Sequence, residues 1–181
     1  MRVRIGDGEE RSRMNIILIG MPASGKSTVG VILAKLLGYD FIDTDLLIQS
    51  RSGLRLSEII RDRGIEGFLA AEAKACLSLK AERCVIATGG SVVYSQPAMA
   101  HLKMLGCVAC LEVDFDILQE RLDDIQGRGV VLRPGQTLRQ LYDERMPLYH
   151  RYADIVVPEH NCTLEETVRA VYARYTAYER A

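Results

Sequence analysis

The sequence has no tryptophan and only three phenylalanines, and aromatic residues make up 6% of its 181 positions. This scarcity argues against an aromatic-rich pocket that holds a nucleobase as the molecule acted upon. The sequence also lacks an excess of either charge, since 23 Lys and Arg residues stand against 24 Asp and Glu residues, for a formal net charge of −1. No global basic field attracts nucleic acid or an anionic membrane, so we expect neither as a partner.

Long apolar runs are also missing, because none approaches the roughly 18 residues that a transmembrane helix needs. Residues 1–13 are polar and lack both the apolar segment and the small-residue cleavage site of a secretory signal. We interpret them as a disordered or loosely attached arm. The five cysteines are an odd number and lie mostly in apolar stretches, which indicates reduced thiols and a cytoplasmic protein.

Two of the cysteines, Cys107 and Cys110, are spaced like a redox or zinc pair. They lie in an apolar run that is typical of a strand, and residues three apart in a strand point to opposite faces of the sheet. We therefore interpret both as core residues rather than as metal ligands.

What the sequence does contain is a regular alternation of apolar runs and helical patterns. Strands are predicted over 15–19, from 41 into 43–45, and over 84–87, 107–113 and 155–157. Helices are predicted over 26–37, 45–51, 56–63, 66–80, 96–104, 116–124 and 137–149, and from 163 onward. In the first helix, Val29, Leu33, Leu36 and Leu37 share an apolar face. This alternation predicts a parallel sheet covered by helices on both faces, in one α/β domain over residues 14–181.

The residues between the first strand and the first helix, Gly20 to Ser27, match the phosphate-binding pattern G-x-x-x-x-G-K-[ST]. Glycine at positions 20 and 25 lets backbone N–H groups approach phosphate oxygens, and the following helix directs its positive end at the anion. Lys26 can reach the β- and γ-phosphates, and the Ser27 hydroxyl is a ligand for Mg²⁺. The residues predicted to bind ATP are Gly20, Ser24, Gly25, Lys26, Ser27 and Thr28.

Two motifs of other nucleotide-binding proteins are absent, which argues against two classes of enzyme. A GTPase would carry N-K-x-D, and neither Asn15 nor Asn161 is followed by lysine. A motor or transporter ATPase would end a later strand in an acidic pair, whereas the third strand here ends in Thr88-Gly89-Gly90. Glycine at that point permits close approach by another molecule.

Two carboxylates, Asp43 and Asp45, stand at the end of the second strand. Residues two apart in an extended segment share a face, and the carboxyl ends of parallel strands converge beside the phosphate-binding loop. One carboxylate can support Mg²⁺ while the other holds or deprotonates an acceptor hydroxyl. The same residues also suit a turn or a helix cap, and the spacing alone leaves both interpretations open.

From about residue 16 to residue 157 the sequence resembles the shikimate kinase family. The matching positions are the phosphate-binding loop, Phe41-Ile42-Asp43-Thr44-Asp45, Gly64, Phe68, Glu72, Ala87-Thr88-Gly89-Gly90, Arg121 and Arg145-Met146-Pro147-Leu148-Tyr149. The resemblance implies a P-loop NTPase fold with a five-stranded parallel sheet and a mobile lid over about 125–136. It also implies a kinase that transfers the γ-phosphoryl group of ATP to a hydroxyl of a small carboxylate-bearing metabolite, shikimate by default.

The resemblance further assigns roles to individual residues. It implies that Asp43 supports Mg²⁺, that Asp45 contacts the acceptor hydroxyl, and that Gly89 and Gly90 line the acceptor pocket. In the same way, Arg145 pairs with the acceptor carboxylate.

Two further arginines concern the nucleotide. The resemblance implies that Arg121 lies near it and that a lid arginine closes over the phosphates. The family usually has Arg-Pro-Leu-Leu in the lid, and the nearest run here starts at Arg128, with Arg133 close by as an alternative. We predict three catalytic residues, which are Lys26, Asp45 and Arg128.

Three departures from the family fall around the acceptor. Leu69 stands where an arginine usually grips the substrate carboxylate, Ile65 replaces a usual glutamate, and Ser91 replaces the third glycine of a triple. The loss of one arginine weakens the hold on a carboxylate, which leaves another small hydroxy acid such as homoserine as an alternative acceptor. A catalytically silent ATP-binding sensor is the alternative from another class. We expect a monomer rather than a dimer.

Overall fold

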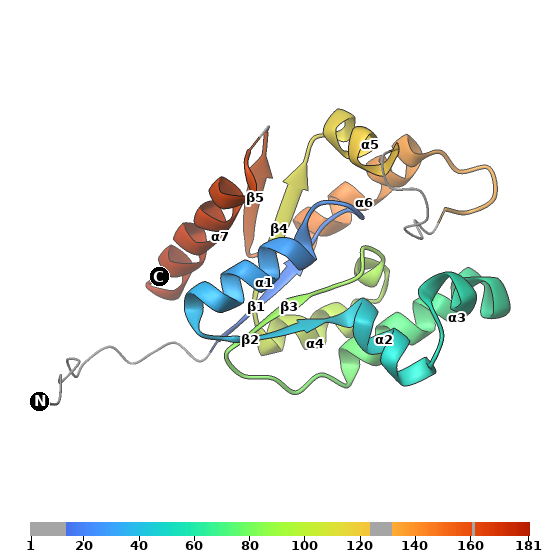
Figure 1. Ribbon diagram of the computed structural model, residues 1–181, viewed down its shortest axis with the longest axis horizontal. Coiled ribbons are helices and arrows are strands. Elements are labelled where there is room, and N and C mark those ends of the chain that lie inside the picture. Colours follow the sequence, from blue (N-terminus) through green and yellow to red (C-terminus); the bar gives the residue numbers. More distant parts are fainter. Residues whose placement is uncertain (1–13, 124–131, 161) are drawn as a thin grey trace, which may run out of the picture.

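The computed structural model describes residues 14–123, 132–160 and 162–181. Its strands form one parallel sheet in the order β2-β3-β1-β4-β5, which confirms the predicted five-stranded parallel arrangement (Figure 1). The strands are β1 (Asn15–Ile19), β2 (Asp40–Asp43), β3 (Cys84–Ala87), β4 (Gly106–Val113) and β5 (Ile155–Glu159).

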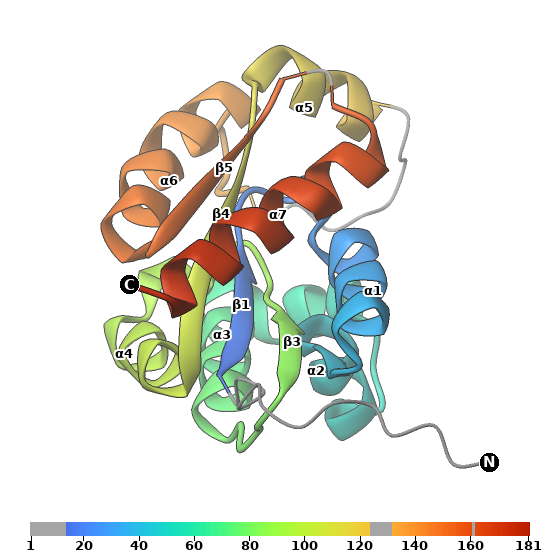
Figure 2. The ribbon, with the colours of Figure 1, turned by 90° about the vertical axis from the view of Figure 1, so that its left-hand side faces the viewer.

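Helices cover both faces of this sheet. One apolar cluster joins the sheet to α1 and α7, and a second joins it to α3, α4, α5 and α6 (Figure 2). The helices are α1 (Lys26–Leu37), α2 (Thr44–Ser52), α3 (Leu56–Leu77), α4 (Gln96–Leu105), α5 (Phe115–Asp123), α6 (Leu138–Tyr152) and α7 (Leu164–Glu179), with a short 3₁₀ helix, η1 (Val92–Tyr94), before α4. The strands and helices predicted from the sequence are all present, with ends that differ by a few residues.

The central strands are buried on both faces, as an apolar run without alternation requires. In β1, Ile16 packs in the cluster with α1 and α7, whereas Ile17 packs in the cluster on the opposite face. Cys107 and Cys110 of β4 divide between the same two clusters, and neither is exposed. This confirms that they are core cysteines on opposite faces.

The predicted apolar face of α1 was wrong at Leu36, which is 59% exposed. The buried stripe runs instead through Val29, Gly30, Leu33 and Ala34. Val29 and Leu33 are buried as predicted, and Gly30 lets the helix lie close to β2, because a Cβ there would come within 2.6 Å of Phe41 Cε2. The helix therefore faces the sheet with a mixed stripe of large and small residues, and Leu36 lies outside it.

Two predicted helices, over 56–63 and 66–80, form the single element α3 with a break between them. Gly64 has φ 69° and ψ 179°, a conformation that glycine adopts without a Cβ penalty. The element ends at Leu77, three residues before the predicted end. Glycine at position 64 therefore separates a first helical segment, next to α2, from the longer part of α3.

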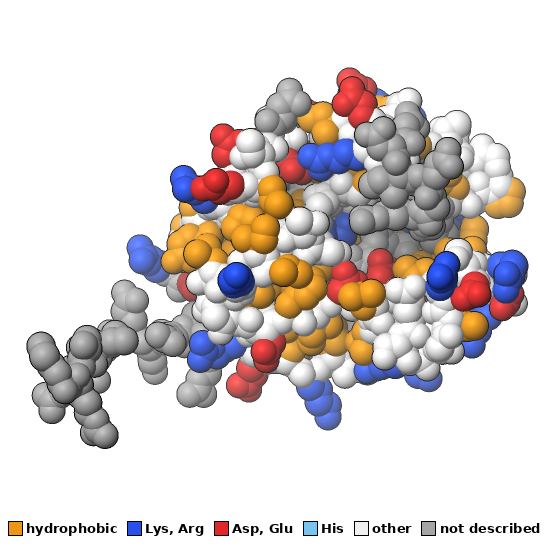
Figure 3. Space-filling view, in the orientation of Figure 1, with side chains coloured by type: hydrophobic (Ala, Val, Ile, Leu, Met, Phe, Trp, Pro, Cys, Tyr) orange, Lys and Arg blue, Asp and Glu red, His pale blue; other side chains and the backbone are white. Residues whose placement is uncertain are grey.

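Two predicted segments lie wholly or partly outside the described residues. The predicted arm over 1–13 is one, and the predicted lid, of which residues 125–131 are not described, is the other. Within the described residues, no helix is long and apolar enough to cross a membrane. On the face shown in Figure 3, acidic and basic side chains are interspersed rather than gathered by sign.

Candidate active site

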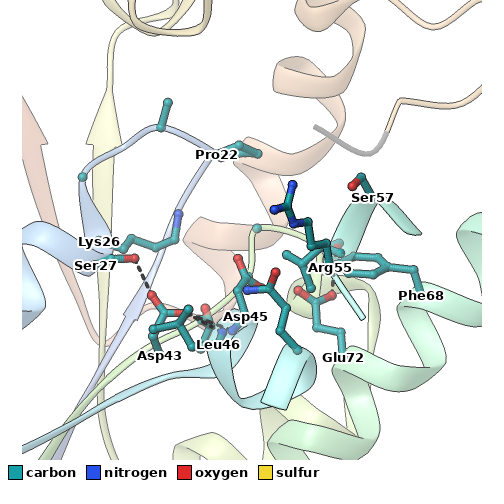
Figure 4. A pocket seen from close by; sticks show the side chains of 18 of the residues that line it. Pro22, Lys26, Ser27, Asp43, Asp45, Leu46, Arg55, Ser57, Phe68 and Glu72 are labelled. Atoms are coloured by element: carbon teal, nitrogen blue, oxygen red, sulfur yellow. Dashed lines mark hydrogen bonds between the residues drawn. The ribbon is translucent and has the colours of Figure 1, made fainter. Parts of the chain in front are cut away.

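A cleft of about 520 Å³ opens at the carboxyl ends of β1, β2 and β3, where an open parallel sheet places its ligand. Its walls come from the loop after β1, the start of α2, one side of α3, the loop after β3 and Arg145 of α6 (Figure 4). Among the residues predicted from the sequence, the cleft is lined by Gly25, Lys26, Ser27, Thr28, Asp43, Asp45, Gly89, Gly90 and Arg145. Gly20, Ser24 and Arg121 lie outside this lining.

The loop after β1 has the backbone conformation that its glycines permit. Gly20 has φ 144° and Gly25 has φ 84°, both outside the usual range of other residues. A Cβ at position 20 would also lie 2.6 Å from the Leu111 carbonyl oxygen, so only glycine fits there. These constraints hold the loop close to β4 and direct it onto the N-terminal end of α1.

Lys26 is 8% exposed and folds back over this loop. Its Nζ donates hydrogen bonds to the carbonyl oxygens of Gly20 at 2.9 Å and Met21 at 2.7 Å, and to Ser24 Oγ at 3.3 Å. Burial lowers the pKa of Lys26 to about 8, and the nearby Asp45 carboxylate opposes that shift. The ammonium is thus positioned at the loop that binds phosphate.

The two carboxylate oxygens of Asp43 have different partners. Its Oδ1 accepts from the backbone N–H of Asp45 at 2.9 Å and of Leu46 at 3.3 Å, which caps α2. Its Oδ2 accepts from Ser27 Oγ at 2.6 Å. A hydroxyl and a carboxylate oxygen in contact fit the hard-oxygen ligand set of Mg²⁺, which keeps its other positions for phosphate and water. No group of three acidic, His or Cys side chains among the described residues forms a metal cage.

Asp45 presents its carboxylate to the other end of the cleft. Its Oδ1 is buried and has no hydrogen-bond partner among the described residues. Burial and the adjacent Asp43 carboxylate raise the pKa of Asp45, while Lys26 acts in the opposite direction. A buried carboxylate oxygen without a partner is costly unless a ligand satisfies it, and an acceptor hydroxyl would do so.

Glu72 is a second buried carboxylate beside Asp45. It is 1% exposed, its Oε2 accepts from Ser91 Oγ at 2.6 Å, and its Oε1 has no partner among the described residues. Burial raises the pKa of Glu72 to about 7, and the Ser91 hydrogen bond opposes that shift. In the sequence, Glu72 is identified only as a position that matches the family, and Ser91 only as a departure from it. Their contact connects residues 19 apart and has no local sequence signal.

Gly89 lies directly against both carboxylates. A Cβ at this position would overlap Glu72 Oε1 and would lie 2.8 Å from Asp45 Oδ1. The Gly89 backbone N–H donates to Thr44 Oγ1 at 3.1 Å, which fixes the loop after β3 to the start of α2. Glycine at position 89 therefore brings backbone, rather than side chain, up to the unpartnered carboxylate oxygens.

Arg145 is 2% exposed and forms no ion pair among the described residues. Its Nε donates to the Tyr94 hydroxyl at 3.1 Å, and its guanidinium lies 5.1 Å from the centre of the same ring. Tyr149 donates from its hydroxyl to the Gly90 carbonyl oxygen at 2.6 Å, which ties α6 to the loop after β3. A buried cation held in this way is preorganised for an anion in the cleft.

Two other predicted arginines, Arg121 and Arg133, are absent from the lining of the cleft. Arg121 forms a two-pronged contact with Glu159, with both N–O distances at 3.2 Å, and its Nη1 lies 3.5 Å from the Ala23 carbonyl oxygen. It therefore lies next to the phosphate-binding loop. Arg133 pairs with Glu144 at 3.7 Å, and the predicted lid residue Arg128 lies outside the described residues.

Comparisons with known proteins agree with this geometry. The family model for shikimate kinase matches residues 22–176. A shikimate kinase of Thermodesulfovibrio yellowstonii is 36% identical over 164 residues, which cover 89% of this chain and 94% of that protein.

Solved structures give the same result. A shikimate kinase from Acinetobacter baumannii, in complex with shikimate, has a TM-score of 0.82 and 28% identity over 93% of this chain and 96% of its own. A shikimate kinase from Aquifex aeolicus has a TM-score of 0.77 and 30% identity over 93% of this chain and 99% of its own. The chain therefore belongs to the shikimate kinase family, whose members are phosphotransferases that use ATP and act on a hydroxyl group.

Proposed function

We propose that the protein transfers the γ-phosphoryl group of ATP to a hydroxyl of shikimate. The observation that carries this proposal is the presence in one cleft of the buried Arg145 guanidinium and of Asp45 Oδ1, which have no ion pair and no hydrogen-bond partner, respectively, among the described residues. A molecule with both a carboxylate and a hydroxyl satisfies the two together. Lys26, on the phosphate-binding loop, lines the same cleft.

The chemistry follows from these positions. Asp45 accepts a hydrogen bond from the acceptor hydroxyl and takes its proton as the hydroxyl oxygen bonds to the γ-phosphorus. The bond from that phosphorus to the β,γ-bridging oxygen breaks, and ADP leaves with the electron pair. Lys26 stabilises the charge that develops on the transferring phosphoryl group.

The nucleotide is held by Gly20, Ser24, Gly25, Lys26, Ser27 and Thr28 in this proposal, with Arg121 next to the loop. Ser27 and Asp43 would hold Mg²⁺, which neutralises phosphate charge when bound. Gly89 and Gly90 form the acceptor wall. Arg128 remains our proposal for the residue that closes over the phosphates, and we propose a cytoplasmic monomer.

The proposal is tested by measuring ADP release with ATP, Mg²⁺ and a panel of small hydroxy acids. We expect shikimate to stimulate ADP release, with a phosphate monoester of shikimate identified by ³¹P NMR. A reaction without acceptor gives the background rate of ATP hydrolysis. Stimulation by homoserine but not by shikimate would overturn the proposed acceptor, and no stimulation by any member would favour a silent ATP-binding protein.

A further inference from the structure

The start of α3 places a second arginine in the cleft. Arg55 precedes the first residue of this helix and lines the cleft together with Phe68, Glu72 and Arg145. Its side chain points across the cleft toward Pro22 on the phosphate-binding loop (Figure 4). Arg55 and Arg145 are the two arginines in the lining that the described residues provide.

Within the part of the chain that the structure describes, the Arg55 guanidinium has no partner. Among the described residues, no hydrogen bond or ion pair involves its side chain, although several other surface arginines have a carboxylate within 4 Å. Its backbone N–H donates to Glu58 Oε2 at 2.7 Å, which caps α3. The cap uses only the backbone of residue 55, so the side chain is available for a ligand.

Position 69, in contrast, is not available for one. Leu69 is partly buried against the apolar cluster of Ile48, Ile59, Phe68 and Ala75, and it is absent from the lining of the cleft. The side of the cleft next to Phe68 therefore has Arg55 as its cation.

We infer that Arg55 and Arg145 hold the carboxylate of the acceptor from two sides. Arg145 is buried and aimed by Tyr94, whereas Arg55 is exposed and reaches in from the start of α3. Two guanidinium groups can each donate to one carboxylate, and the carboxylate oxygens have enough lone pairs for both. This inference rests on the proposed function, because Arg55 is assigned to the carboxylate of the acceptor that the proposed function names.

The experiment compares KM values of the unmodified protein with those of Arg55→Met and Arg55→Lys. For Arg55→Met we expect the KM for shikimate to rise by about tenfold, because one charge-assisted contact is lost, while the KM for ATP changes little. The KM of Arg55→Lys for shikimate should lie between those of the unmodified protein and Arg55→Met, because lysine keeps the charge but not the planar guanidinium. Arg63→Met is the matched control, because Arg63 is an exposed arginine of α3 outside the lining, and both KM values should stay unchanged.

The methyl ester of shikimate separates direct contact from a structural effect. The ester has no carboxylate charge, so Arg55→Met should not raise its KM further. An equal rise for acid and ester would overturn the inference, as would an unchanged KM for shikimate in Arg55→Met. If the unmodified protein fails to phosphorylate shikimate at all, the proposed function is overturned and the inference falls with it.

Discussion

The two ends of the cleft differ in how their polar groups are satisfied. At the nucleotide end, Lys26 donates three hydrogen bonds within its loop, and Ser27 and Asp43 bond to each other. At the acceptor end, buried oxygens of Asp45 and Glu72 have no partner among the described residues, and the guanidinium of Arg145 forms no ion pair there.

This difference has a physical explanation. The phosphate-binding loop recognises a ligand with backbone N–H groups, so its side chains can bond to the loop itself and exchange partners when phosphate arrives. A small acceptor offers only a few polar atoms, and specificity for them requires side chains that stay unsatisfied until the acceptor binds. Of the departures from the family, Ser91 bonds to Glu72 at the acceptor end, whereas Leu69 packs in an apolar cluster outside the lining of the cleft.

The largest effect is expected from Lys26→Ala at the nucleotide end. Loss of the ammonium removes stabilisation of the transferring charge and should lower kcat by at least about 10². Turnover is measured by ADP release, and the far-UV circular dichroism should stay unchanged. Lys35→Ala, on the exposed side of the same helix, is the matched control and should turn over normally. Normal turnover in Lys26→Ala would contradict the assignment of the catalytic end.

Gly89→Ala tests the acceptor end by adding one methyl group. Because that Cβ would overlap Glu72 Oε1 and crowd Asp45 Oδ1, we expect kcat/KM for shikimate to fall by at least about tenfold. The KM for ATP should change little. Gly38→Ala is the control, since a Cβ there meets nothing within 4 Å and its positive φ costs stability alone. Equal losses for both substrates would contradict the separation of the two ends.

Much of this architecture could be predicted from the sequence because it depends on local patterns. The apolar run of β1, the contiguous phosphate-binding motif and the glycine at position 64 each determine their own backbone. The acceptor end depends instead on packing between distant elements. Arg55 is 90 residues from Arg145, and Ser91 meets Glu72 only because the loop after β3 lies on α3. No spacing rule indicated that Arg55 would face the cleft.

Glu72→Gln tests the burial of charge at the acceptor end through stability. Glutamate in an unfolded chain has a pKa near 4.5, and burial raises the pKa of Glu72 to about 7 in the folded protein. The folded state therefore holds an extra proton between these values, and this group makes the protein less stable as pH rises from about 4.5 to about 7. Glutamine has no proton to lose.

The free energy of unfolding is measured with urea at pH 5 and pH 8 without ligand. Relative to the unmodified protein, Glu72→Gln should therefore be more stable at pH 8 than at pH 5. We expect this relative gain to be roughly 1–3 kcal/mol, since Ser91 and Arg145 offset part of the cost of the charge. A difference for Glu72→Gln that is equal at both pH values would contradict the burial of a titrating charge there.

The smallest effect is expected from Glu159→Gln, near the nucleotide end. Glu159 is 5% exposed and holds both terminal nitrogens of Arg121, with Thr167 Oγ1 as a further donor at 3.2 Å. An amide keeps the shape but not the charge, so Arg121 should lose its fixed orientation next to Ala23. Because Arg121 is about a third exposed, solvent weakens this pair, and we expect the KM for ATP to rise only about two- to fivefold.

The KM for shikimate should not respond to Glu159→Gln, because Glu159 touches no residue of the acceptor wall. Glu165→Gln removes an exposed carboxylate of α7 that pairs with Arg169 four residues on, and it should change neither KM value. Arg55→Met and Glu159→Gln would then form a matched pair, in which each variant raises the KM of one substrate and leaves that of the other. A rise in both KM values from Glu159→Gln would show that the two ends of the cleft are coupled through the loop after β1, rather than recognising their substrates independently.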